Sequence, residues 1–200
     1  MLQNHIPPAV LAAALSACAV QPEILNSERI EQRFGSYEIE VIEQSSAVRR
    51  SNLYSTDGNV ITCRTYAVVE FVDSDMTDIA ETHSGVLAGE SIGAMFKTAG
   101  WVIEKETFYV GEMQVANPLH PIGRLMRLDA PASLGVHAYR LLLSKKSRSI
   151  HYATIVETHH PDYLVEADLL ELYPPVSEPR PTDDEIRALI TLVLGVNQPN

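Results

Sequence analysis

The segment His159-His160-Pro161-Asp162 has the residue types needed for proton-transfer chemistry. An imidazole changes its charge near neutral pH, and a carboxylate beside it can orient the ring, so such a pair can work as a general acid or base. Successive side chains of a strand point to opposite faces, so at most one of the two histidines can join Glu157 or Asp162. The ordinary alternative is that His160 caps the following helix, while His159 lies on the surface or binds a neighbouring loop.

A second candidate for chemistry is Ser91, the central residue of Gly89-Glu90-Ser91-Ile92-Gly93. These residues fit the letters Gly-x-Ser-x-Gly of a nucleophile elbow, in which the serine sits on a sharp turn between a strand and a helix. Here the letters lie inside a helix-like stretch, well after the preceding predicted strand. We interpret the match as a product of the glycine spacing, and Ser91 is a nucleophile only in a rival hypothesis.

The seven histidines form no familiar metal motif, since neither His-Glu-x-x-His nor a pair of Cys-x-x-Cys motifs is present. His137 and His151 fall on one predicted hairpin, but one lies near its open end and the other near its turn. They are too far apart to share an ion whose bonds are ~2 Å long. From the sequence we therefore expect no metal and no cofactor.

Cys18 is preceded by Leu15-Ser16-Ala17, which follow the apolar run of residues 9–14. Small residues before a cysteine at the end of an apolar stretch resemble the lipobox of bacterial lipoproteins. The resemblance implies that residues 1–17 are a signal peptide and that Cys18 becomes an N-terminus carrying fatty acyl chains such as palmitate. It also implies a lipid-anchored location in the cell envelope, facing the periplasm. Ala19 stands where inner-membrane lipoproteins usually carry aspartate, which favours the outer membrane if the organism has one.

The charge balance limits the partners of the folded part. The chain has 15 Lys and Arg against 26 Asp and Glu, a net charge of −11, and none of these residues precedes position 18. An acidic body repels nucleic acid and anionic lipid headgroups. We therefore expect no nucleic-acid partner and contact with the membrane through the lipid only. With Cys18 acylated, Cys63 has no disulfide partner, and we expect it in the core as a small hydrophobic residue.

Alternating apolar residues predict seven strands, over residues 37–43, 48–55, 60–73, 101–110, 122–128, 136–144 and 149–158. Asp57-Gly58 is a preferred pair for a two-residue hairpin turn, which would place Tyr54 opposite Ile61 and Asn52 opposite Cys63. In the long third strand we expect one shared face for Ile61, Cys63, Ala67, Val69 and Phe71.

The last predicted hairpin turns around residues 145–148. A loop of two or four residues places two sets of side chains on one face: His137, Tyr139, Leu141 and Leu143 from the first strand, and Ile150, Tyr152, Thr154 and Val156 from the second.

Three helices are predicted. The first covers residues 75–99 and contains Gly85, Gly89 and Gly93, four residues apart on one stripe. Close packing of the helix on the sheet explains the stripe; a break into two helices near Gly89, or a ligand or partner helix on the stripe, are the alternatives. The second helix opens at His160-Pro161-Asp162. The third follows the capping box of residues 182–185, after a proline-rich connector over residues 174–181.

This order of elements predicts an α+β fold: a mainly antiparallel sheet of about seven strands, with one helix inserted after strand three and two C-terminal helices packed on it. Residues 34–200 form a single domain, preceded by a lipidated N-terminus and short tether over residues 18–33. We expect a non-catalytic binding or assembly module with an unidentified protein partner. The rival is a periplasmic hydrolase or metal-assisted enzyme using His159, His160 and Asp162, or Ser91. A carrier of a small hydrophobic ligand is a further alternative.

Overall fold

The computed structural model describes residues 24–72 and 77–175, together with Ala188 and Thr191. The predicted signal peptide, Cys18 and most of the proline-rich connector lie outside the described residues. So does the last predicted helix, apart from Ala188 and Thr191, which are both helical. In the described part of the chain, no helix combines the length and apolar character that a membrane span requires.

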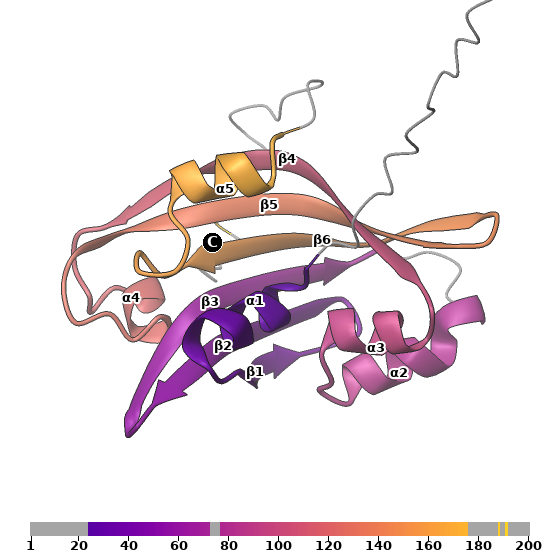
Figure 1. Cartoon of the computed structure of the whole chain (residues 1–200), viewed down its shortest axis with the longest axis horizontal. Helices are drawn as coiled ribbons and strands as arrows, with labels where there is room; N and C mark the ends of the chain where they lie inside the picture. The colour runs from indigo at the N-terminus through magenta and orange to yellow at the C-terminus, as the bar shows by residue number, and fades with distance from the viewer. Residues whose placement is uncertain (1–23, 73–76, 176–187, 189–190, 192–200) are drawn as a thin grey trace, which may run out of the picture.

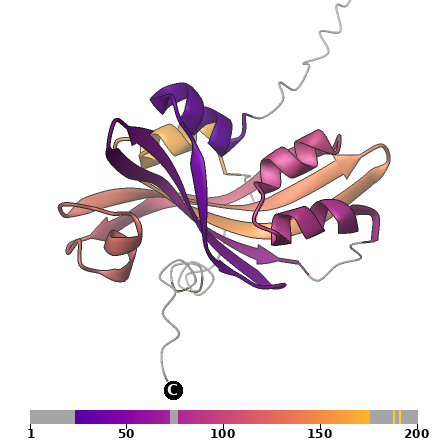
Figure 2. The same ribbon diagram turned by 90° about the horizontal axis from the view of Figure 1, so that it is seen from below.

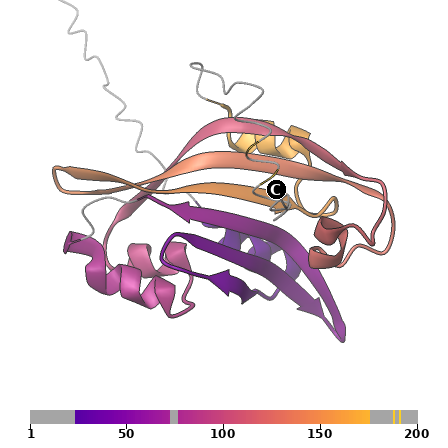
Figure 3. The same cartoon turned by 180° about the vertical axis from the view of Figure 1, so that it is seen from behind.

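One six-stranded antiparallel sheet organises the fold, in the order β1-β2-β3-β6-β5-β4 (Figure 1). The strands are β1 (Glu38–Gln44), β2 (Val48–Asp57), β3 (Val60–Phe71), β4 (Val102–Val115), β5 (Ala132–Lys145) and β6 (Arg148–His159). Two three-stranded halves meet where β3 pairs with β6, through the residue pairs from Thr65↔His159 to Phe71↔Ala153. The hairpin of β5 and β6 extends beyond the other strands at one end (Figure 3). The predicted α+β class with an antiparallel sheet is confirmed.

One of the seven predicted strands, over residues 122–128, is wrong: this stretch contains helix α4 (Pro121–Leu125). Pro121 is the first residue of α4, a position that its fixed φ and missing N–H suit. Ile122 and Met126 of this segment pack on Cys63, Tyr66 and Val136, at one face of the sheet.

The other helices cover the opposite face, which we call the helix-covered face (Figure 2). They are α1 (Asn26–Phe34), the short 3₁₀ helix η1 (Thr77–Ile79), α2 (Ala80–Leu87), α3 (Ile92–Thr98) and α5 (Glu166–Leu172). Ile79, Val86 and Phe96 pack on Phe71, Tyr139 and Tyr152 at one end of this face. Ile30 of α1 and Leu169 of α5 pack with Leu53, Ala67 and Tyr163 at the other end.

The single helix predicted over residues 75–99 is broken, as one of the alternatives had it. Gly89 has a φ of +107°, a conformation that side chains disfavour, and it lies between α2 and α3. The two remaining glycines of the stripe allow close approach: a Cβ at Gly85 would meet Met95, and one at Gly93 would meet Leu25 beside α1. The second predicted helix also begins later than expected, at Glu166, because residues 160–164 form a turn on the His160 carbonyl.

The hairpin of β2 and β3 differs from its predicted register. Asp57 pairs with Val60, so the turn residues are Gly58 and Asn59, and Tyr54 faces Cys63 rather than Ile61. Gly58 has a φ of +58° at the first turn position, the place where type II′ turns take glycine. Farther along, Leu53 pairs with Thr65, which leaves Arg64 as an extra residue.

That extra residue is a β-bulge, and it changes which side chains share a face. Cys63 packs with Tyr66 and Val68 at the face that α4 covers, whereas Ala67 and Val69 belong to the helix-covered face. The prediction that Cys63 shares a face with Ala67, Val69 and Phe71 is therefore wrong.

A second bulge lies in the hairpin of β5 and β6. The turn has two residues, with Lys145 paired to Arg148, but the pairs Leu142↔His151 and Leu141↔Ala153 leave Tyr152 as an extra residue. After Tyr152, each β6 side chain therefore lies on the face opposite to the one expected for a hairpin without a bulge. His137 therefore lies opposite Glu157 rather than Val156. The predicted placement of Thr154 and Val156 on the face of His137 is wrong for this reason.

Candidate functional site

Three ionisable side chains meet on the helix-covered face: His137, Glu157 and His159. His137 and Glu157 are directly opposite each other on β5 and β6, and His159 follows two residues after Glu157 on the same face. The three residues are 0%, 5% and 1% exposed, respectively. A buried ionisable cluster of this kind costs free energy unless its members satisfy one another or a ligand.

The inner atoms of the cluster lie just beyond hydrogen-bonding distance. Glu157 Oε2 is 3.8 Å from His137 Nδ1 and 3.8 Å from His159 Nε2. Among the described residues neither of these two nitrogens has a hydrogen-bond partner. One ligand atom from each of the three residues lies within 4.8 Å of the others.

The outer atoms of the same side chains are held in place. His137 Nε2 is 2.9 Å from Thr107 Oγ1, and His159 Nδ1 is 3.0 Å from Thr65 Oγ1. A hydroxyl can donate or accept, so each ring can present either an N–H or a lone pair to Glu157.

Helix α1 secures the carboxylate through its first residue. Asn26 Nδ2 donates to Glu157 Oε1 at 3.1 Å and to Thr65 Oγ1 at 3.2 Å. The Tyr163 hydroxyl in turn donates to Asn26 Oδ1 at 2.5 Å. The cluster therefore joins α1 and the segment before α5 to the centre of the sheet.

Aromatic rings and a lysine surround His137. The Tyr173 ring stacks on it at 4.4 Å between centroids and 12° between planes. Lys105 Nζ lies 4.9 Å from the centre of the Tyr139 ring and 4.7 Å from that of Tyr173. Arg29 donates to the Tyr173 hydroxyl at 2.6 Å.

Electrostatics make this cluster one carboxylate with two neutral imidazoles at neutral pH. Burial raises the pKa of Glu157, but Lys105 and the two imidazoles outweigh that effect and hold the pKa well below its ordinary value. Burial lowers the pKa of His159 to about 3, although Glu157 opposes the change. Burial also lowers the pKa of His137.

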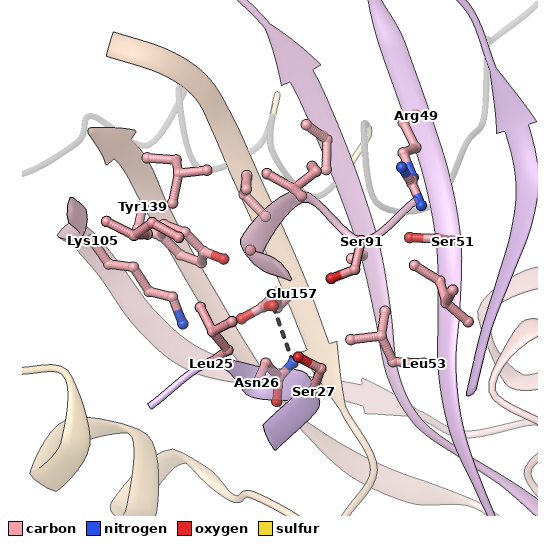
Figure 4. Close-up of a pocket in the computed structure, with 18 of the residues that line it drawn as sticks. Leu25, Asn26, Ser27, Arg49, Ser51, Leu53, Ser91, Lys105, Tyr139 and Glu157 are labelled. Carbon is pink, nitrogen blue, oxygen red and sulfur yellow. Dashed lines mark hydrogen bonds between the residues drawn. The ribbon is translucent and has the colours of Figure 1, made fainter. Parts of the chain in front are cut away.

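A pocket of about 90 Å³ leads to Glu157, between α1, α3 and the sheet (Figure 4). Leu25, Leu53 and Tyr139 are among its apolar and aromatic walls, and Lys105 points into it. Glu157 lines the pocket whereas His137 and His159 do not, so the imidazoles lie behind the carboxylate.

A second hollow adjoins the pocket on the solvent side, between α1 and α3. The two share four lining residues, Leu25, Ser27, Tyr37 and Ser91. The hollow is also lined by the exposed residues Glu31, Ala94 and Lys97. A small molecule or ion therefore has a route from solvent towards Glu157.

Ser91, the predicted nucleophile of the rival hypothesis, lines the pocket just before α3. The residue is half-buried, and Tyr37 lines the same pocket. Burial raises the pKa of Tyr37, so this neighbour is a neutral phenol and a poor proton acceptor at neutral pH.

His160 and Asp162 lie apart from His159, in a network at the protein surface. His160 Nδ1 hydrogen-bonds the Asp162 carboxylate, which also accepts from Arg64 at 2.7 Å. Burial raises the pKa of Asp162, but Arg64 and His160 together lower it below its ordinary value. The structure thus separates the two adjacent histidines, and it contradicts the alternative that His159 lies on the surface.

Cys63 is a free thiol that is 1% exposed, in contact with Met126 Sδ at 3.8 Å. Burial raises its pKa to about 12. This is the environment expected of a small hydrophobic core residue, and it disfavours a reactive thiol.

Sequence reasoning missed His137 and gave Glu157 only a supporting part. With an unbroken hairpin register, His137 and Glu157 fall on opposite faces, and only the extra residue Tyr152 brings them together. The available signal was the spacing of Glu157 and His159, which puts both on one face of a strand whatever its register.

No family model matches the chain. No curated protein and no solved structure is detectably similar to it.

Proposed function

We propose that this protein is a lipoprotein of the bacterial cell envelope that acts as a non-catalytic binding or assembly module. Acyl chains on Cys18 would hold it at a membrane on the periplasmic side, with the outer membrane favoured. The lipobox-like residues before Cys18 support the anchor. The observation that carries the binding role is the pocket between α1, α3 and the sheet, whose apolar walls end at Glu157 and Lys105.

The size and lining of the pocket favour a small ligand that is partly apolar and partly polar. A volume of about 90 Å³ has room for several waters, but it is well below the ~300 Å³ or more that encloses a drug-sized molecule. Opposite charges from Glu157 and Lys105 can pair with a ligand group of either sign. A carrier of a larger hydrophobic molecule is less favoured, because the adjoining hollow of about 340 Å³ is lined partly by the charged residues Glu28, Glu31 and Lys97.

The geometry gives less support to a hydrolase. Ser91 shares the pocket with the Tyr37 phenol, and His160 and Asp162 bind each other and Arg64 at the surface. General-base activation of a serine requires an imidazole or carboxylate within hydrogen-bonding reach. Of the residues proposed for catalysis, Ser91 lines the pocket and His159 lies behind its base.

The anchor is tested by replacing Cys18 with serine in the producing bacterium. We expect the variant to lose radiolabelled palmitate and to move from the membrane to the soluble fraction, because the acyl chains are its membrane contact. Cys63→Ala is the matched control and should keep both label and location. Unchanged labelling and partitioning of Cys18→Ser would refute the anchor.

The pocket is tested by placing a large side chain at its rim. Ser91→Trp should fill the space beside Tyr37, whereas Ser84→Trp on the exposed side of α2 should leave the pocket open. We expect native mass spectrometry of gently extracted protein to show a small bound molecule in the wild type and in Ser84→Trp, but not in Ser91→Trp. An unliganded wild type, or a ligand retained in Ser91→Trp, would argue against a binding role.

A further inference from the structure

We infer that His137, Glu157 and His159 form a binding site for one divalent transition-metal ion of the zinc type. The site would lie behind the pocket, and it depends neither on the lipid anchor nor on the identity of the pocket ligand. Two ring nitrogens and one carboxylate oxygen are the donor set that zinc accepts in sites with three protein ligands.

The two buried nitrogens without a partner are the observation that points to a ligand. His137 Nδ1 and His159 Nε2 both face Glu157 Oε2, at 3.8 Å each, and neither has a hydrogen-bond partner among the described residues. A cation between them would interact favourably with both lone pairs and with the carboxylate. No rearrangement of the strands is needed, since the three side chains already converge.

The spacing is close to that of a bound site. Donor atoms ~2.0–2.1 Å from one tetrahedral ion lie ~3.4 Å from each other. The two distances to Glu157 Oε2 exceed this by a few tenths of an ångström, and the two imidazole nitrogens that face Glu157 lie within 4.8 Å of each other. Small side-chain rotations on a fixed backbone can remove that difference.

The surroundings are those of a supported metal site. Metal-binding imidazoles almost always use their second nitrogen in a hydrogen bond, which fixes the ring and its tautomer. Here Thr107 and Thr65 occupy those second nitrogens, and Asn26 holds the second oxygen of Glu157. Each of the three donor side chains is thus oriented by one polar partner from a different strand or helix.

The charge of the cluster also suits a divalent cation. Both imidazoles are neutral at pH 7 and Glu157 is ionised, so the donors carry one negative charge. Lys105 balances that charge in the structure, and its ammonium would oppose an incoming cation. Removing the charge of Lys105 should therefore tighten metal binding, an effect opposite to that of removing a ligand.

The test uses the full chain without a histidine tag, treated with a chelator and then titrated with Zn²⁺ by isothermal calorimetry. We expect one ion per chain and an increase in melting temperature with Zn²⁺. Co²⁺ should bind the same site and give visible d–d absorption. Mg²⁺ should not compete, because it prefers oxygen ligands.

Variants separate the cluster from other histidines. Glu157→Gln and His159→Gln should weaken Zn²⁺ binding at least ~100-fold, and Thr65→Val should weaken it ~10–100-fold while keeping every ligand. His160→Asn and His151→Asn should bind as the wild type does. Circular dichroism identifies any variant that fails to fold. If a ligand variant does fail, the Zn²⁺ affinity of the near-isosteric Thr65→Val variant provides the test.

Lys105→Gln should change the Zn²⁺ affinity in the direction opposite to that of the ligand variants. We expect this variant to bind Zn²⁺ several-fold more tightly than the wild type. A folded wild type that does not bind Zn²⁺ overturns the site, as does unchanged affinity in both Glu157→Gln and Thr65→Val. Loss of binding in His160→Asn, with the cluster variants unaffected, would move the ion to the protein surface and also overturn the assignment.

Discussion

Glu157 shows how strongly a buried side chain depends on its neighbours. Its carboxylate is taken out of water, yet one oxygen accepts a hydrogen bond from Asn26 and the other faces two imidazoles. With Lys105 nearby, these groups keep the pKa of Glu157 below its ordinary value. A single buried charge is therefore tolerated only because three strands and α1 each contribute a polar partner.

The protonation of His159 makes stability depend on pH. The ring takes up a proton near pH 6.5 in the unfolded chain, but its pKa in the folded protein is about 3. Between these values the unfolded chain binds more protons, so the free energy of unfolding falls as the pH drops from 6.5 towards 3. The depressed pKa of Glu157 acts in the same direction at lower pH. We expect urea unfolding of chelator-treated protein to show lower stability at pH 5 than at pH 8.

Two variants isolate the contribution of His159. His159→Gln removes the titrating group, so the difference between the two pH values should shrink. His120→Gln, at an exposed position in the loop before α4, should keep the wild-type difference. Equal pH dependence in wild type and His159→Gln would show that this ring is not responsible.

At the scale of elements, Arg49 joins β2 to the broken helix segment. Its guanidinium is buried and donates to the backbone carbonyls of Val86, Gly89 and Glu90, at 2.7–3.1 Å. These carbonyls lie at the end of α2 and in the turn before α3, where a helix leaves acceptors unpaired. The fork of N–H groups on arginine suits three acceptors in one place.

Arg49→Lys should therefore destabilise the protein by roughly 1–3 kcal/mol, because one ammonium cannot serve all three carbonyls in this geometry. Arg50→Lys is the matched control on the neighbouring residue, which pairs with the exposed Glu43 and donates one hydrogen bond to the Tyr66 hydroxyl. It should cost less than about 1 kcal/mol. Chemical unfolding of both variants provides the comparison, and equal losses would show that the three carbonyls do not depend on Arg49.

The elements also show what sequence patterns can and cannot predict. Alternation located all six strands, because β2 to β6 each contain buried residues and β1 alternates between exposed and half-buried ones. However, β4 ends at Val115 and β5 begins at Ala132, both beyond the predicted bounds. Helix α4 was taken for a strand since its five residues are too few to show helical periodicity. The faces predicted for side chains of β3 after Arg64 and of β6 after Tyr152 were wrong, because each strand contains an extra residue there. Such a bulge cannot be recognised from the apolar pattern of one strand without its pairing partner.

The sequence did not reveal the full candidate site, because the extra residue in β6 could not be predicted. Ser91 was noticed for its letters, and it does line the pocket. His159 was noticed beside His160, and the expectation that the two point apart is met. His137 could be connected to them only through the register of β5 and β6, which is set by packing across the whole sheet.

At the scale of the whole molecule, Cys63 offers a reporter of global unfolding. The thiol is buried in the core at the face that α4 covers, and its pKa is raised to about 12. In a Cys18→Ser chain, where it is the only thiol, we expect negligible reaction with iodoacetamide in native buffer at pH 8 and complete reaction in denaturant. Rapid labelling of the native protein would show that this part of the core opens locally.

Within the described residues, the two halves of the sheet are joined by the pairing of β3 with β6. Thr65 of β3 and His159 of β6 face each other at the end of that pairing, 94 residues apart in the chain. An ion held by His137, Glu157 and His159 would therefore join β5 to β6 within one half of the sheet, while His159 reaches across the seam only through Thr65. Chains pulled from both ends in a force experiment should then part at this seam under a load that zinc changes little, whereas zinc should raise the load at which β5 separates from β6.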